Sequence, residues 1–353
     1  MASSAVSRRR WGVGTLAAAA AWPMAARAGN DVLRVLAWPG YAEPEVVAEF
    51  ERRHGCRVEV SEIDSDATLW QRVRERNGAD FDVFAVNTAE LQRYLRANLA
   101  LPLTPALLPL LSRQEDRFRD VSALPGIARN GQRWAVPFAW AEMGLIHDRR
   151  RCPEPPDSIH ALWDSRWRGQ VLAYNGGTHN FSLAAQALGW SDPFQIAETQ
   201  WTPAVHKLIA LRRNVSGFYT QPEEAVRLFR QRQAAIMFAN YGTQQLHLLR
   251  AAGVDAGYVI PREGALAWLD CWVMARGARN TALAHAWINH LLDQPASDLL
   301  RQRQGLNNTT GGGLSPQAGG RLVWLAPVES EDRRSRLWSR IFSGDNATKV
   351  LGT

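Results

Sequence analysis

Cysteine is scarce in this sequence, and its positions form no familiar pattern. Among 353 residues only three are cysteines, Cys56, Cys152 and Cys271. Their spacing matches no zinc-binding motif, so we expect no metal site built on them. An odd number leaves two arrangements open, one disulfide with one free thiol or no disulfide at all. We expect all three side chains to be structural.

Lysine, basic runs and long apolar runs are also scarce. The chain has two lysines, Lys207 and Lys349, and its arginines are scattered. The formal charge of +7 at pH 7 falls to +3 without the four arginines of residues 1–28. Such a mild excess without a basic run predicts no nucleic-acid partner. No apolar stretch is long enough to span a bilayer.

Residues 1–28 have the features of an export signal peptide. Consecutive arginines precede a short apolar run, and Ala26-Arg27-Ala28 forms a small-x-small cleavage pattern. The stretch from Ser7 to Trp11 is similar to a twin-arginine signal. We therefore predict cleavage near Ala28 and a mature protein in the periplasm. No lipid anchor is expected, because no cysteine lies near the cleavage position.

The stretch from Gly264 to Ala275 has the most informative pattern in the chain. With the two-residue period of a β-strand, one face is apolar, and the other places Asp270 between Trp268 and Trp272. A carboxylate among aromatic rings is costly to desolvate without a cationic or hydrogen-bonding partner. Indole faces attract cations. Two interpretations stay open: this face binds a positively charged group, or a buried aspartate caps a loop beside core tryptophans.

From Asp31 onward, short apolar strands alternate with amphipathic helices. Strands are expected at 32–38, 56–63 and 81–86, and Asp66 is expected to cap the second of the helices between them. This order is typical of a doubly wound α/β sheet, whose ligand crevice lies beyond the carboxyl ends of the strands. Four residues that fall at such ends are predicted ligand contacts: Trp38, Tyr41, Asn87 and Thr88.

A second series of strands and helices follows an extended segment at 134–140. Strands are expected at 144–147, 169–174, 235–238 and 258–260, and helices at 181–188, 202–212, 222–232, 243–251, 281–292, 295–303 and 331–342. Tyr241 follows the end of one of these strands and is also a predicted contact. The turn at 175–179 precedes a helix, whose first N–H groups suit a polar or anionic ligand group.

Seven short stretches, in order along the chain, resemble the spermidine/putrescine-type periplasmic binding proteins of ABC transporters. They are LAWPGY at 36–41, FERRHGCRV at 50–58, DFDVF at 80–84, AVPFAW at 135–140, WDSRWRGQV at 163–171, ALGW at 187–190 and PREGALAWLD at 261–270. The resemblance covers essentially the whole chain after residue 28. It implies a two-lobed type II periplasmic binding fold that closes on a small amine-bearing solute and delivers it to a membrane permease. We expect the protein to be a monomer.

The resemblance also implies where the two lobes divide. The first lobe would comprise residues 29–137 and 271–312, and the second residues 138–270 and 313–353. The chain would cross between them near Pro137 to Ala139, near Asp270 to Trp272, and in the Gly-rich linker at 311–320.

Matching the family's ligand contacts residue by residue gives a partial site. Trp268 and Asp270 match the most diagnostic pair, a stacking indole and a carboxylate that accepts an ammonium. Further matches are an aromatic pair, a polar contact and the position of a second stacking tryptophan, held here by Trp38 with Tyr41, by Asn87 and by Phe238. In polyamine binders the loop at 175–179 carries carboxylates, but here it holds Gly176 and His179, and Leu306 replaces a later tyrosine. The second anionic contact is therefore absent.

A dication needs an anionic partner at each end. Either Glu142 supplies the second one, or the ligand has a single cationic group. A zwitterion would place its ammonium at Asp270 and its acid at His179 and the N–H groups of the adjacent turn. The alternatives are that Glu142 is an exposed strand carboxylate and that His179 faces solvent at a helix start.

Other classes of function have weaker support. Cys271, His179 and Asp270 suggest a cysteine-dependent hydrolase, but strand geometry turns Cys271 away from the face of Asp270. The sequence has no Gly-x-Ser-x-Gly, phosphate-loop or His-Glu-x-x-His motif. Ferric-iron binders of the same fold use clustered tyrosines, whereas the six tyrosines here are scattered. We expect a binding protein with no cofactor, no metal and no enzymatic activity.

Overall fold

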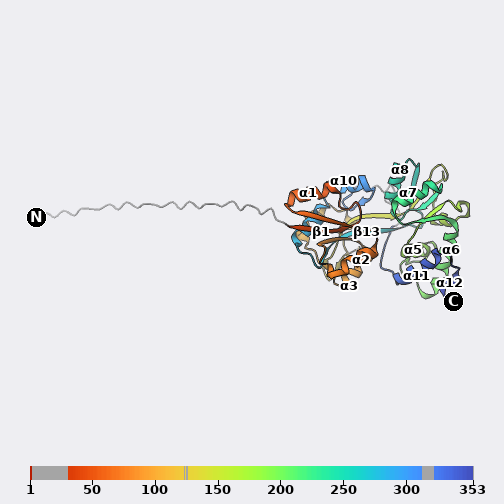
Figure 1. The fold of residues 1–353 in the computed structure, drawn as a ribbon, viewed down its shortest axis with the longest axis horizontal. Helices are drawn as coiled ribbons and strands as arrows, with labels where there is room; N and C mark the ends of the chain where they lie inside the picture. Colours follow the sequence, from red (N-terminus) through yellow and green to blue (C-terminus); the bar gives the residue numbers. More distant parts are fainter. Residues whose placement is uncertain (2–30, 123, 125, 312–321, 353) are drawn as a thin grey trace.

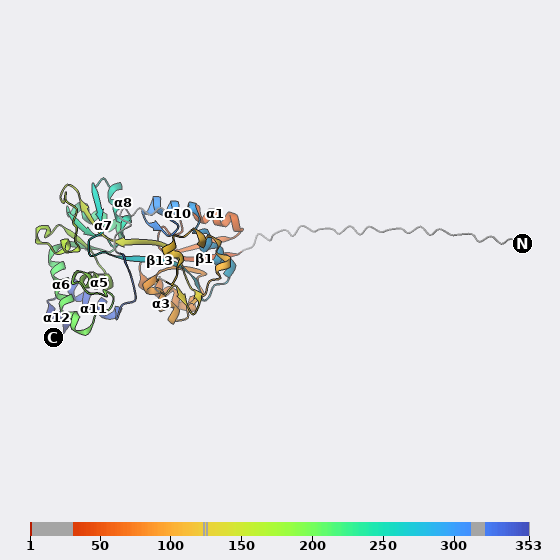
Figure 2. The same cartoon turned by 180° about the vertical axis from the view of Figure 1, so that it is seen from behind.

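The chain forms two α/β lobes that lie side by side, as Figures 1 and 2 show from opposite directions. The structure is a computed structural model that describes residues 1, 31–122, 124, 126–311 and 322–352. The predicted signal peptide, apart from Met1, and nearly all of the predicted Gly-rich linker lie outside these residues. Each lobe contains a mixed sheet, so the predicted α/β fold class is confirmed. We name them the large-sheet lobe and the small-sheet lobe.

The large-sheet lobe contains an eight-stranded sheet, counted over the described residues. Its strands are β1 (Val32–Ala37), β2 (Arg57–Glu62), β3 (Val83–Asn87), β4 (Ala100–Leu101), β7 (Val136–Met143), β13 (Ala265–Ala275), β14 (Asn307–Asn308) and β15 (Leu322–Trp324). The main order is β14-β7-β13-β3-β1-β2, with β4 and β15 also paired to β13. β1 is parallel to β2 and β3, whereas β13 is antiparallel to β3 and β7. The long strand β13 thus has partners on both sides.

Helices cover the large sheet, and their local sequences explain their ends. They are α1 (Pro44–His54), α2 (Asp66–Arg74), α3 (Thr88–Arg96), α4 (Asp116–Arg119), α9 (Thr281–His290) and α10 (Gln294–Leu299), with a π-helical turn at Leu300–Gln304 and a small hairpin of β5 (Ala128–Arg129) and β6 (Gln132–Arg133). In α1, Pro44 occupies the first turn and Gly55 ends the helix in the left-handed conformation. Ser65, not Asp66 as predicted, caps α2 by accepting a hydrogen bond from the Thr68 N–H, because Asp66 is already helical.

The two faces of β13 contact different cores, as its two-residue period predicted. Trp272 and Met274 are buried in one core, with helices α1 and α9. Leu269, Cys271 and Val273 are buried in the other, with residues of α2 and α3. Because both faces of β13 pack against cores, only some of its side chains can reach the edge of the large sheet that faces the small-sheet lobe.

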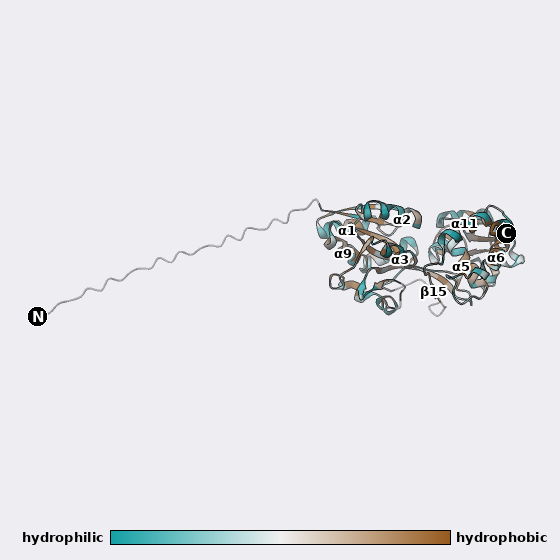
Figure 3. Cartoon of the chain, turned by 90° about the horizontal axis from the view of Figure 1, so that it is seen from below, coloured by the Kyte–Doolittle hydropathy of each residue, from teal (hydrophilic) through white to brown (hydrophobic). Residues whose placement is uncertain are grey.

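The small-sheet lobe contains five strands in the order β10-β9-β11-β8-β12, counted over the described residues. They are β8 (Leu145–Asp148), β9 (Val171–Tyr174), β10 (Val215–Tyr219), β11 (Ile236–Phe238) and β12 (Ala256–Val259). Its helices are α5 (Gly177–Ala187), α6 (Trp201–Asn214), α7 (Pro222–Gln231), α8 (Thr243–Ala251), α11 (Glu331–Phe342) and α12 (Ala347–Leu351). In Figure 3, α2 and α11 are largely hydrophilic and lie on facing sides of the two lobes.

A fully buried arginine attaches α11 to the rest of the small-sheet lobe. Arg334 is 0% exposed and donates hydrogen bonds to both carboxylate oxygens of Glu329, at 2.8 and 2.7 Å. It also donates to the Ser182 hydroxyl on α5 at 2.8 Å and to the Thr178 carbonyl at 3.0 Å. Because a buried guanidinium is tolerated only when it is paired, this network fixes the position of α11.

The chain passes between the two sheets at Gly144, at 260–264 and beyond β15. Gly144 separates β7 from β8, and its N–H donates to the Tyr258 hydroxyl at 3.0 Å, which itself donates to the Glu142 carbonyl. A Cβ on Gly144 would lie 2.6 Å from the Val259 carbonyl oxygen, so the crossing accepts only glycine without adjustment. The predicted lobe boundaries at 137/138 and 270/271 fall inside β7 and β13, several residues from these crossings. The boundaries themselves stay a prediction.

None of the three cysteines, all of which lie in the described part of the chain, forms a disulfide. Cys152 and Cys271 are buried and Cys56 is half-buried. Of the two arrangements that the sequence left open, the structure has the one without a bridge. None of the helices that the structure describes is both long and apolar enough to traverse a bilayer.

Candidate functional site

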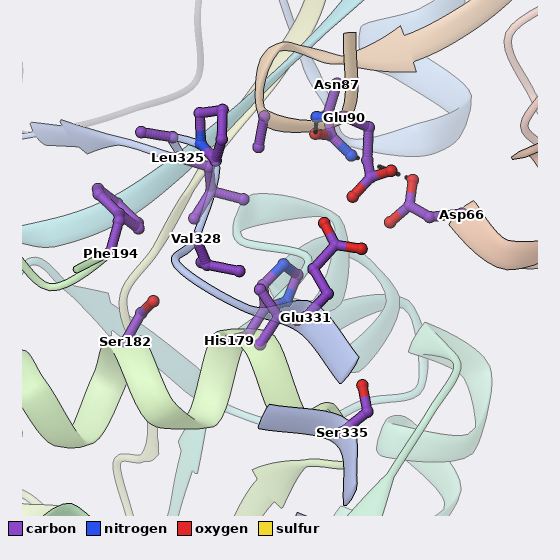
Figure 4. A pocket seen from close by; sticks show the side chains of 14 residues that line it. Asp66, Asn87, Glu90, His179, Ser182, Phe194, Leu325, Val328, Glu331 and Ser335 are labelled. Carbon is purple, nitrogen blue, oxygen red and sulfur yellow. Dashed lines mark hydrogen bonds between the residues drawn. The ribbon is translucent and has the colours of Figure 1, made fainter. Parts of the chain in front are cut away.

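A pocket of about 130 Å³ lies between the two lobes, and both contribute to its lining. The large-sheet lobe contributes Asp66, Asn87, Ala89 and Glu90, and the small-sheet lobe contributes Thr178, His179, Ser182, Phe194, Glu331 and Ser335. The segment 325–328, which follows β15, completes it. Figure 4 shows Asp66, Glu90 and Glu331 with their carboxylates turned toward one another. We call it the inter-lobe pocket; of the predicted contacts, Asn87 and His179 line it.

Asp270 lies next to this pocket, on β13. It is paired in register with Asn87 of β3 and is 7% exposed. The Tyr41 hydroxyl donates a 2.6 Å hydrogen bond to Asp270 Oδ2. Burial raises the pKa of Asp270 to about 7, the Tyr41 hydrogen bond opposes that rise, and the negative charge of Asp66 adds to it. Asp270 is therefore a carboxyl group that changes charge near neutral pH and lacks a cationic partner among the described residues.

The aromatic residues around Asp270 differ in accessibility. Trp268 is half-buried, and its Nε1 donates to the Asn240 carbonyl at 3.0 Å, which links β13 to the small-sheet lobe. Trp38 is also half-buried, and its Nε1 has no hydrogen-bond acceptor among the described residues. Trp272 is 0% exposed, so only one of the two indoles that share the Asp270 face can meet a solute. Tyr41 is 4% exposed and acts on Asp270 through its hydroxyl.

Asn87 and Thr88 occupy the junction between β3 and α3. The Asn87 side chain caps α3 by accepting a 2.9 Å hydrogen bond from the Glu90 N–H. Its amide Nδ2 donates to Asp66 Oδ1 at 3.1 Å. Thr88 is 0% exposed, and its hydroxyl donates to the Leu325 carbonyl at 3.4 Å. Asn87 therefore connects the strand pair of Asp270 with the carboxylate of Asp66.

The predicted contacts from the small-sheet lobe lie in three different environments. His179 Nδ1 lies 2.8 Å from Asn240 Oδ1, and burial lowers the pKa of His179 to about 4, so the ring is neutral at pH 7. The Tyr241 hydroxyl donates to the Thr220 carbonyl at 2.6 Å. Phe238 is 1% exposed and belongs to the core of its lobe, so its ring cannot reach a solute in this conformation.

Glu142 is not an exposed strand carboxylate, which was one of the two interpretations of this residue. It is 0% exposed on β7, and Asn307 Nδ2 donates to its Oε2 at 3.4 Å. Burial results from the position of β7 between β13 and β14. His179 is half-buried and lines the inter-lobe pocket.

Three carboxylates that the sequence analysis did not select lie in the inter-lobe pocket. Asp66, Glu90 and Glu331 all occupy the first turns of helices, where acidic residues are common because of the helix dipole. Burial and the charge of Glu331 raise the pKa of Asp66 to about 6. Burial, the hydrogen bond shared with Glu331 and the charge of Asp66 raise the pKa of Glu90 to about 9. Local sequence offers no signal that these three groups meet, since they come from α2, α3 and α11.

The structure gives no support to a metal site or a thiol nucleophile. Over the residues described, no group of three His, Cys, Asp or Glu side chains is arranged to hold a metal ion. Cys271 is buried in the core on the face opposite Asp270, and burial raises its thiol pKa. A catalytic thiolate needs the reverse, a lowered pKa and access to substrate.

Comparison with proteins of known sequence gives relatives across most of the chain. It is 26% identical to the putrescine-binding periplasmic protein PotF of Escherichia coli over 296 residues, which cover 79% of this chain and 75% of the relative. It is 24% identical to a putrescine/agmatine-binding protein of Pseudomonas aeruginosa over an alignment 371 positions long, which covers 94% of this chain and 96% of the relative.

Solved structures share the fold. The TpPotD lipoprotein of Treponema pallidum superposes with a TM-score of 0.75 at 15% identity, covering 88% of this chain and 99% of that one. A putative spermidine/putrescine ABC transporter protein from Listeria monocytogenes has a TM-score of 0.70 at 19% identity, covering 89% and 98%. The predicted type II periplasmic binding fold is thereby confirmed. The family model described as bacterial extracellular solute-binding protein matches residues 45–300, and the chain belongs to this family.

Proposed function

We propose that this protein is the periplasmic receptor of an ABC importer for a small organic cation of the polyamine class. The observation that carries the proposal is Asp270, a buried carboxyl group of the large-sheet lobe, paired in register with the pocket residue Asn87, whose partner is the Tyr41 hydroxyl and not a cation. An ammonium supplies what the tyrosine cannot, a full positive charge. Relatives named for binding putrescine, agmatine or spermidine support the same class of ligand.

In this proposal Asp270 pairs with one ammonium, and half-exposed aromatic rings contact the alkyl chain. Trp268 and Trp38 remain accessible enough for this role, and Tyr241 would complete the enclosure from the small-sheet lobe. A cation over an indole face gains up to about 2 kcal/mol once water is excluded. The lobes then close around the solute by movement at the crossings near Gly144 and 260–264. Closure presents the loaded protein to its permease, and no covalent chemistry takes place.

The lining of the inter-lobe pocket favours a cation over a zwitterion. It includes three carboxylates and neither lysine nor arginine among the described residues. His179, the residue expected to meet the acid of a zwitterion, is neutral because burial lowers its pKa to about 4. An acid placed there would be desolvated beside negative charges, which is unfavourable.

A ligand screen tests the proposal directly. Thermal unfolding with 1,4-diaminobutane, agmatine and spermidine should show stabilisation that grows with ligand concentration. The ω-amino acid 4-aminobutanoate, glutamate and ferric citrate should produce no shift. Stabilisation by 4-aminobutanoate but not by the amines would overturn the proposal in favour of a zwitterion receptor, and colour with ferric iron would favour a metal carrier.

A further inference from the structure

We propose that Asp66, Glu90 and Glu331 form a second anionic subsite, which receives the distal cationic group of the ligand whose first ammonium pairs with Asp270. This inference rests on the proposed function and specifies the ligand further: it carries two positive charges separated by an alkyl chain. The subsite would replace the carboxylates that are absent from the loop at 175–179.

The three side chains come together only across the two lobes. Asp66 and Glu90 belong to α2 and α3 of the large-sheet lobe, and Glu331 begins α11 of the small-sheet lobe. In Figure 4 Glu331 points toward Asp66 and Glu90 across the inter-lobe pocket. A cation held among them would contact both lobes, as a ligand that stabilises closure must.

Glu90 supplies an independent sign that a ligand group is expected in this pocket. It is 9% exposed, and its Oε2 is buried without a hydrogen-bond donor among the described residues. Arg93 Nη1 lies 3.5 Å from that oxygen, at ion-pair distance, without making a hydrogen bond to it. Burial, the hydrogen bond shared with Glu331 and the charge of Asp66 keep Glu90 protonated at pH 7 in the unliganded protein. An ammonium or guanidinium in the pocket would replace that proton and supply hydrogen-bond donors to the carboxylate.

In the absence of a cation, the local charges are balanced in part by a proton on Glu90, whose pKa is raised to about 9, and a bound cation would take the place of that proton. Arg93 is 3.8 Å from Glu331 as well as 3.5 Å from Glu90, and its guanidinium also stacks on the Trp70 ring at 3.9 Å. One guanidinium therefore faces three carboxyl groups. The neighbouring arginines of α11 are engaged elsewhere, since Arg333 pairs with Glu198 and Arg334 with Glu329.

Asn87 connects the two ends of the proposed site. Its backbone is paired in register with Asp270, and its side chain donates to Asp66. The charge of Asp66 contributes to the raised pKa of Asp270, which requires the two carboxyls to be close. The proposal therefore requires an extended diamine to reach along Asn87 from Asp270 to the subsite.

Calorimetry with two amines of equal chain length tests the two ends of the proposed site separately. The probes are 1,4-diaminobutane and butylamine, which differ in the second ammonium. The wild-type protein should bind the diamine about tenfold to hundredfold more tightly. The double variant Glu90→Gln with Glu331→Gln should lose that preference and bind butylamine as before. Glu198→Gln, an exposed ion-pair partner on the small-sheet lobe, is the control and should change neither affinity.

The possible negative results of this experiment refute different proposals. If the double variant keeps the wild-type preference for the diamine, the subsite is refuted while the proposed function stands. If the wild-type protein binds neither amine, the proposed function fails first. Should the double variant unfold, Glu331→Gln alone carries the test, because that side chain is 44% exposed at a helix start, and it should reduce diamine affinity several-fold without affecting butylamine.

Discussion

Replacing Asp270 with asparagine is the sharpest test of the binding site. The amide keeps the shape of the side chain, and its oxygen can still accept the hydrogen bond from the Tyr41 hydroxyl, but the negative charge is lost. Breaking a buried ion pair by removing one partner costs about 3–5 kcal/mol. We therefore expect affinity for amines to fall about a hundredfold to a few thousandfold.

The pH dependence of amine binding gives a second quantitative prediction for Asp270. The pKa of Asp270 is about 7, and an ammonium binds its ionised form. About one tenth of the carboxyl groups are ionised at pH 6 and about nine tenths at pH 8, so butylamine affinity should rise about tenfold between these values. The asparagine variant should lack this rise. Butylamine is the right probe, because a diamine would add the titration of Glu90.

Whereas the affinity for butylamine should rise with pH, the stability of the unliganded protein should fall. Folding raises the pKa of Asp270 from 3.8 to about 7, so the ionised carboxyl destabilises the folded state. The loss grows as pH rises from about 4 to about 7 and is at most about 4 kcal/mol. At pH 8 the asparagine variant should therefore unfold at the same or a higher temperature than the wild-type protein, while it binds far more weakly.

Titration calorimetry at pH 6, 7 and 8, with thermal unfolding in parallel, measures all three effects. The control is Asp148→Asn, a buried carboxyl of the small-sheet lobe that pairs with Arg151 and should not affect amine binding. An asparagine variant of Asp270 that binds amines within threefold of the wild-type protein at pH 8 would refute the assignment of this carboxylate.

Three further changes probe the ring contacts, the attachment of α11 and the crossing between the sheets. Trp268→Leu should lower amine affinity about tenfold in calorimetry. The control is Trp163→Leu, which removes a similarly hydrogen-bonded indole elsewhere; equal losses would show that the effect is not local. Arg334→Met should destabilise the fold by about 3–5 kcal/mol in urea unfolding, because Glu329 keeps a charge without its partner; a loss below about 1 kcal/mol would contradict the network. Gly144→Ala should lower the unfolding temperature, since its Cβ would lie 2.6 Å from a carbonyl oxygen, and an unchanged value would show that the crossing can adjust.

The sequence predicted the fold better than the site because periodicity is a local property. The bounds of α8 and α11 agree with the predicted helices at 243–251 and 331–342, and the two faces of β13 were assigned correctly from its alternation. The cap of α2 was placed one residue too late, because Ser65 and Asp66 are both good caps. The predicted lobe boundaries fall inside β7 and β13 and stay a prediction.

The site depends on contacts that no local pattern encodes. Tyr41 is buried in a core of the large-sheet lobe and bonds to Asp270, which lies 229 positions away in the chain. Phe238 was predicted as a contact because it matches the position of a stacking tryptophan, but the core of the small-sheet lobe encloses it. Asp66 and Glu90 resemble ordinary first-turn acids, and only the approach of α11 reveals them as neighbours of a third carboxylate.

The inter-lobe pocket has acidic side chains on both of its walls, Asp66 and Glu90 on one and Glu331 on the other. Like charges that face each other oppose approach, most strongly at low ionic strength. An empty receptor would therefore resist shutting, and a solute without positive charge would leave that resistance in place whatever its shape. The receptor would thus select ligands by charge through lobe closure. The transporter would then meet a closed receptor mainly when that receptor holds a ligand.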